Sequence, residues 1–103
     1  MVKTRLESIF SSTEMNRIKI TEDSLKHLLI VADVHGLKCY QAKRFISNIV
    51  NVIQSSFQLI IIHGYTHGTA IKDMLQHNFR NPHIQELFPD YRNKGVTHMI
   101  IAA

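Results

Sequence analysis

One stretch decides the fold: Leu28-Leu29-Ile30-Val31-Ala32-Asp33-Val34-His35-Gly36. Its first five residues form a continuous apolar run that ends shortly before a glycine. This pattern is typical of a strand buried on both faces or lying in the centre of a sheet. From Lys38 to Gln54 the period changes, because apolar residues recur at spacings of three and four. That spacing predicts an amphipathic helix directly after the strand.

A second strand and helix are predicted further along the chain. The apolar, β-branched run from Phe57 to Ile62 indicates a strand. The helix that follows is predicted from four apolar positions on one side, at Ile71, Met74, Leu75 and Phe79. His83 to Phe88 is expected to form one short helix that ends at Pro89, and Val96 to Ile101 a last strand.

The order strand, helix, strand, helix, short helix, strand predicts an α/β fold, a two-layer sandwich. The first two strands should be parallel, because a helical crossover joins them. We expect this domain over residues 28–103, preceded by an N-terminal helix or arm over residues 1–27. In that first segment Leu6, Ile9, Phe10 and Thr13 recur at helical spacing, and Thr21 is a candidate cap for a short helical turn.

Composition limits the class of protein. With 45 % hydrophobic and 19 % charged residues, the 103-residue chain can build one folded core. No apolar run approaches the ~20 residues that span a bilayer, so we expect no membrane partner and no signal peptide. Cys39 is the only cysteine, which excludes an internal disulfide and fits the cytoplasm. Without a cysteine cluster, no structural metal is expected.

Positive charge collects just after the first strand. The formal net charge is +4, and residues 34–51 carry Lys38, Lys43 and Arg44 with no acidic residue. A basic surface of this kind permits contact with phosphate backbones. The simpler interpretation is a solvated helix face.

Two loops are expected at one edge of the sheet, because both follow the carboxyl ends of parallel strands. In the first loop, Asp33 and His35 alternate along an extended chain and point to the same side. A carboxylate beside an imidazole can orient the ring and raise its basicity, which makes His35 a candidate general base. The alternative is that Asp33 caps a turn and His35 is only a polar strand end.

The second loop runs from His63 to Gly68. Gly64 and Gly68 allow tight turns and the close approach of a ligand to backbone N–H groups, and a helix N-terminus follows them. Lys72 lies one turn into that helix. The loop is therefore either a phosphate cradle or a glycine turn with solvated histidines.

Three short motifs resemble those of the small MutS-related (Smr) domain family. They are Ala32-Asp33-Val34-His35-Gly36-Leu37 with Ala42 on the next helix, Ile61-Ile62-His63-Gly64 followed by Gly68, and Gly95-Val96-Thr97 entering the last strand. Their order matches the Leu-Asp-x-His-Gly opening, the second glycine loop and the closing Gly-Ala-Thr element of the family. The resemblance implies a sandwich similar to the C-terminal domain of translation initiation factor 3. It also implies binding to DNA or RNA, with endonuclease activity in some members.

Three functions remain open from the sequence. In the first, an endonuclease that uses Mg²⁺ or needs no metal, the catalytic residues are Asp33 and His35. The expected nucleic-acid contacts are Lys38, Lys43, Arg44, His63, Gly64, Tyr65, Thr66, His67, Gly68 and Lys72. The second function is a module that binds nucleic acid without cutting it, and the third is a protein-interaction domain. Thr66 and His67 depart from the glycine-rich stretch that is common in the Smr loop, which bears on cleavage more than on the fold.

Overall fold

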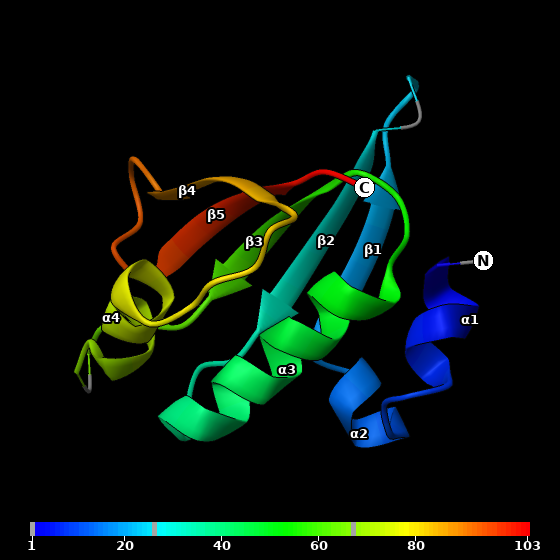
Figure 1. Ribbon diagram of the computed structural model, residues 1–103. Coiled ribbons are helices and arrows are strands. Elements are labelled where there is room, and N and C mark those ends of the chain that lie inside the picture. The colour runs from blue at the N-terminus through cyan, green and yellow to red at the C-terminus, as the bar shows by residue number, and fades with distance from the viewer. Residues whose placement is uncertain (1, 26, 67) are drawn as a thin grey trace.

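The computed structural model describes residues 2–25, 27–66 and 68–103 (Figure 1). Its elements are α1 (Val2–Glu7), α2 (Ser12–Met15), β1 (Ile18–Glu22), β2 (Leu28–Asp33), α3 (Cys39–Val52), β3 (Phe57–Ile62), α4 (Ala70–His77), β4 (Ile84–Pro89) and β5 (Val96–Ile101). The result is a mixed α/β domain around a single five-stranded sheet. The strand, helix, strand and helix predicted between residues 28 and 79 are confirmed, with bounds that differ by a few residues.

The sheet has the strand order β1-β2-β3-β5-β4. The crossover through α3 makes β2 and β3 parallel, as predicted, and pairs Asp33 with Ile62 at their carboxyl ends. The other neighbours in the sheet pair in the antiparallel sense. The two loops that follow β2 and β3 therefore leave the sheet at the same edge.

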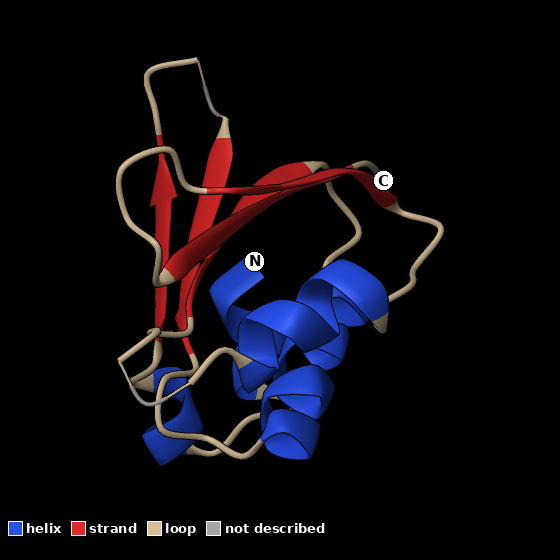
Figure 2. Ribbon diagram, turned by 90° about the vertical axis from the view of Figure 1, so that its left-hand side faces the viewer, coloured by secondary structure: helices blue, strands red, loops and turns tan. Residues whose placement is uncertain are grey.

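The helices cover one face of the sheet and leave the other face open (Figure 2). In β3 the burial alternates, so that Phe57, Leu59 and Ile61 are buried against the helices while the residues between them are half-buried. Helix α3 supplies the matching apolar stripe through Ala42, Phe45, Ile46, Ile49 and Val50. One apolar core thus fills the space between two layers.

The segment predicted as a short helix over residues 83–88 is instead strand β4, so that expectation is wrong. Six residues between Pro82 and Pro89 are too few for a helix that is stable without strong packing. Pairing with β5 satisfies the backbone groups of the segment instead, with a bulge between Ile84 and Glu86.

The segment before residue 28 also differs from expectation. The predicted cap at Thr21 is wrong, because Thr21 lies inside strand β1 and faces Leu29 of β2. Two short helices, α1 and α2, replace the predicted single helix, since Ser11 and Glu14 form a capping box that starts a new helix. Leu6 and Phe10 are buried in the same core as the sheet, whereas Ile9 is exposed. Among the described residues, no helix has the length and apolar character needed to cross a membrane.

Candidate functional site

The two loops at the carboxyl ends of β2 and β3 line one crevice of about 570 Å³. The first loop contributes His35, Gly36 and Leu37, and the crevice is completed by His63, Gly64, Tyr65, Thr66, Gly68, Ala70 and Ile71. The prediction of a shared crevice is confirmed for both loops. Asp33 does not line the crevice itself but contacts His35 next to it.

Asp33 orients the imidazole of His35. Its Oδ1 atom lies 2.5 Å from Nδ1 of the ring and also accepts the backbone N–H of His35 at 3.2 Å. Because a carboxylate can only accept, Nδ1 is the donor in this bond, and Nε2 is the nitrogen that carries the lone pair in the neutral ring. The His35 side chain remains 65 % exposed. An oriented, solvent-accessible imidazole with a free lone pair is suited to removing a proton from a nucleophile.

Arg17 holds the same loop from the N-terminal side. Its Nη1 donates to the carbonyl oxygens of Asp33 at 3.1 Å and His35 at 3.3 Å, and its own carbonyl accepts the N–H of Asp33 at 2.8 Å. Sequence reasoning missed this residue. The alternation of Ile18, Lys19 and Ile20 was the available signal, because it indicates a strand that brings Arg17 beside β2.

His63 is buried in the wall of the crevice. Its Nδ1 donates to the carbonyl oxygen of Gly64 at 2.7 Å, and its Nε2 accepts the hydroxyl of Thr97 at 2.8 Å. Both ring nitrogens are therefore engaged within the protein. Burial lowers the pKa of His63 below 6.5, and the charge of Lys72 acts in the same direction, while the bond to Gly64 opposes it. His63 thus fixes the glycine loop to β5, which differs from the direct ligand contact expected from sequence.

The depressed pKa of His63 predicts a loss of stability in mild acid. Because the unfolded chain binds this proton more readily, the free energy of unfolding should fall as pH drops below 6.5, by at most about 1.4 kcal/mol per pH unit. The free energy of unfolding should keep falling until the pH lies below the pKa of His63 in the folded protein. Urea unfolding between about pH 7.5 and 5.5 measures it, in a window above the carboxylates that titrate near 4.

The control for this prediction is a pair of histidine variants. His63→Gln should flatten the pH dependence, whereas His77→Gln, on the exposed side of α4, should retain it. An equally steep dependence in the His63→Gln protein would assign the effect to other groups.

Glycines let the crevice loops pack closely. Gly64 has φ +75°, in the left-handed region that side chains disfavour, and a Cβ there would lie 3.6 Å from Cβ of His35. Behind it, a Cβ at Gly95 would approach Cα of Gly64 to 3.0 Å. The carbonyl of Gly95 accepts the N–H groups of both His63 and Gly64. Gly95, from the third sequence motif, therefore packs against the glycine loop of the second motif and hydrogen-bonds to it.

The predicted cations are distributed unevenly around the crevice. Lys38 precedes α3, next to the first loop, and Lys72 lies close enough to His63 to lower its pKa. Arg44 lines a neighbouring hollow that shares Leu37 with the crevice. Lys43 is exposed on α3 and lines neither hollow. The predicted contact at His67 lies outside the described residues.

The donor set at the crevice does not build a magnesium site. Mg²⁺ prefers several oxygen ligands, but no carboxylate lines the crevice among the described residues, and Asp33 beside it is bonded to His35. Within residues 2–25, 27–66 and 68–103, no group of three or more His, Cys, Asp or Glu side chains is placed to hold a metal ion.

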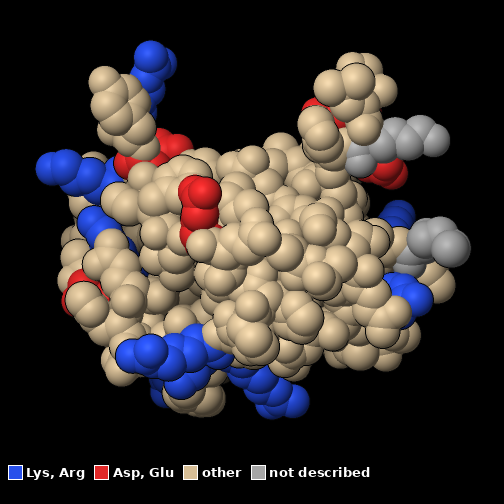
Figure 3. Space-filling model, turned by 45° about the horizontal axis from the view of Figure 1, so that its top comes forward, with Lys and Arg blue, Asp and Glu red and all other residues tan. Residues whose placement is uncertain are grey.

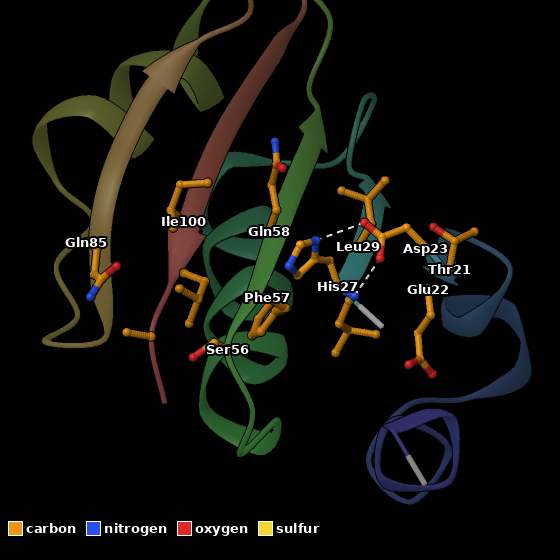
Figure 4. Close-up of a pocket in the computed structure, with 13 residues that line it drawn as sticks. Thr21, Glu22, Asp23, His27, Leu29, Ser56, Phe57, Gln58, Gln85 and Ile100 are labelled. Atoms are coloured by element: carbon orange, nitrogen blue, oxygen red, sulfur yellow. Dashed lines mark hydrogen bonds and ion pairs between the residues drawn. The ribbon is translucent and has the colours of Figure 1, made fainter. Parts of the chain in front are cut away.

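A larger hollow of about 670 Å³ lies at the opposite end of the strands, on the face without helices (Figure 4). Leu29, Gln58 and Ile100 line it. At its edge Asp23 binds His27, but the same carboxylate also accepts the N–H groups of Leu25 and His27 and so holds the β1–β2 turn. The hollow lacks the glycine loop and the helix N-terminus that the crevice has.

Charge is also sparse on one face of the molecule. With the top of the molecule turned forward, this broad face consists mostly of uncharged side chains, and Lys and Arg lie mainly at its edges (Figure 3). A polyanion lying on this face would meet few cations. The crevice loops lie instead at the lower left in Figure 1, where α3 and α4 begin.

The comparisons with known proteins do not place the chain in a family. No protein-family model, curated protein or solved structure matches it significantly.

Proposed function

We propose that this domain binds DNA or RNA and cleaves a phosphodiester bond in the crevice, as an Smr-like endonuclease. One observation carries the proposal: His35, oriented by Asp33, stands at a crevice lined by Gly64, Gly68 and the first residues of α4. The Asp33–His35 pair can activate a nucleophile. The glycine loop and the start of α4 can surround a phosphate with backbone N–H donors.

The cleavage step uses these parts in order. Nε2 of His35 takes a proton from water or from a ribose hydroxyl, and that oxygen forms a new bond to phosphorus. The bond from phosphorus to the leaving oxygen breaks, and the leaving oxygen takes a proton from water. The imidazolium then gives its proton to the hydroxide that this leaves, which restores neutral His35. Backbone N–H groups at the start of α4 and the ammonium of Lys72 stabilise the negative charge that develops on the phosphate. Asp33 stabilises the imidazolium while it holds the proton.

The resemblance to Smr domains supports this proposal, because the three motifs that carry it lie at or directly behind the crevice. The first two motifs supply the two sides of the crevice, and Gly95 of the third packs against Gly64. The order of elements from β2 to β5, with helices on one face, is also consistent with a sandwich similar to the C-terminal domain of translation initiation factor 3.

The first test is binding and its dependence on salt. We expect affinity for RNA or DNA to fall as salt rises, because phosphate contacts release counterions. The double variant Arg44→Ala/Lys72→Ala should flatten the slope of log affinity against log salt by about two, one for each lost contact. Fluorescence anisotropy with labelled oligonucleotides, with and without Mg²⁺, measures the slope.

A control variant removes the same charge elsewhere. Lys19→Ala/Arg80→Ala lowers the net charge equally, but neither residue lines the crevice or its neighbouring hollow. Its slope should stay close to that of the unaltered protein. If both double variants flatten the slope equally, net charge explains the binding and the crevice does not. Binding without cleavage in every condition would leave the non-catalytic module as the function.

A further inference from the structure

The hollow beside the crevice that Arg44 lines, which we call the side groove, lies between the N-terminal segment and α3 and measures about 430 Å³. The side groove has an apolar wall where Phe10 and Phe45 stack with ring centroids 4.8 Å apart. Two guanidinium groups, those of Arg17 and Arg44, also line it, together with the exposed ring of Tyr40. Aromatic, apolar and cationic groups are thus combined in one small hollow.

The side groove adjoins the crevice, because Leu37 lines both. Leu37 follows His35 by two residues, so a chain held at His35 can extend into the side groove without leaving the surface. Each of the two adjoining hollows carries one exposed tyrosine. Tyr40 in the side groove exposes 68 % of its surface, and Tyr65 in the crevice exposes 53 %.

The charges in the side groove suit an anion. Glu14 is the only acidic residue among the described residues that line it, and its carboxylate already accepts the backbone N–H of Ser11 at 2.9 Å. Arg17 uses Nη1 for the carbonyls of Asp33 and His35, which fixes its guanidinium at the junction with the catalytic loop. A phosphate at this junction would meet a positioned cation.

We propose that the side groove is a subsite for the nucleotide next to the cleaved phosphate of a single-stranded nucleic acid. Tyr40 stacks on the unpaired base, and Arg17 and Arg44 contact the phosphate of that nucleotide. This inference rests on the proposed function, and it adds a substrate class to it. An unpaired base can turn its face to an aromatic ring, whereas the bases of a duplex are stacked on one another and paired.

The experiment compares single strands with duplexes of the same sequence. Anisotropy titrations at one salt concentration use labelled RNA and DNA with the unaltered protein, Tyr40→Ala, Tyr40→Phe and Tyr91→Ala. We expect Tyr40→Ala to weaken single-strand binding about tenfold, the effect of losing one stacked base. Duplex binding should not change measurably, and Tyr40→Phe should bind as the unaltered protein does. Tyr91→Ala is the matched control, because Tyr91 is 94 % exposed and lines neither hollow.

The outcomes separate the two proposals. If the unaltered protein binds no nucleic acid, the proposed function fails and the subsite fails with it. If it binds, but Tyr40→Ala behaves like Tyr91→Ala, the subsite is overturned and the proposed function stands. An equal loss for single strands and duplexes would also overturn the subsite, since stacking on an unpaired base cannot explain it. Thermal melting of each variant establishes that the compared proteins are folded.

Discussion

His35→Ala is expected to abolish cleavage while leaving nucleic-acid affinity within a few-fold of the unaltered protein. The imidazole acts on the proton of the nucleophile, so its contribution appears in the transition state more than in the bound ground state. Removal of a general base lowers the rate by about 10²- to 10⁴-fold. Single-turnover cleavage of a labelled strand measures the rate, and anisotropy on the same strand measures the affinity.

Two further variants make this result specific. Asp33→Asn should reduce the rate less completely, because the amide keeps much of the geometry but loses the charge that stabilises the imidazolium. His27→Ala should cleave normally. It removes the imidazole of a second exposed Asp–His pair, Asp23 and His27, whose atoms are 2.9 Å apart at the opposite end of the strands.

Full cleavage by His35→Ala, after removal of contaminating nucleases, would overturn the mechanism. A large loss of affinity in the same variant would instead make His35 a binding residue and favour the non-catalytic module. A loss of cleavage in His27→Ala would move the candidate site to the hollow on the open face of the sheet.

The sequence predicted the part of the fold that local patterns encode. The run Leu28 to Ala32 and the helical period after Lys38 together imply a parallel crossover, and a parallel crossover places the two loops at one edge. The crevice between His35 and Gly64 follows from that topology alone. Sequence reasoning could therefore place the two loops before any contact between them was known.

The missed strands depended on pairing partners outside their own residues. Residues 84–89 carry no clear alternation, and their backbone finds hydrogen bonds only because β5 lies beside them. Strand β1 did carry an alternating signal at Ile18 and Ile20, but Thr21 and the acidic residues after it also fit a helix cap. Local preference was ambiguous there, and pairing with β2 decides the structure.

The roles of individual side chains were harder to predict than their neighbourhood. His63 was expected to face a ligand, but Thr97 and Gly64 engage both of its ring nitrogens. That arrangement needs the antiparallel pairing of β3 with β5, which no local motif contains. Arg17 likewise reaches the loop after β2 only because β1 is an edge strand beside β2.

Leu59→Ala should cause the largest loss of stability among these variants. Leu59 is fully buried at the centre of β3, where it pairs with Ile30 and Met99, both also fully buried. A buried leucine replaced by alanine typically costs about 2–5 kcal/mol, a large part of the stability of an ordinary domain. Urea unfolding measures the loss. Cleavage per folded molecule should not change. Leu59 lies inside β3, outside both crevice loops, and it lines neither the crevice nor the side groove.

Ile60→Ala is the matched control for this effect, and it also tests the open face of the sheet. Ile60 is the next residue on the same strand, but it is half-buried on the face without helices. Its truncation should therefore cost less than half as much, because fewer apolar contacts are lost and no closed cavity forms. An equal loss in both variants would contradict the expected two-layer packing in solution. It would mean that another surface covers the open face, and the free energy of unfolding of Ile60→Ala would then depend on protein concentration if that surface were a second copy of the chain.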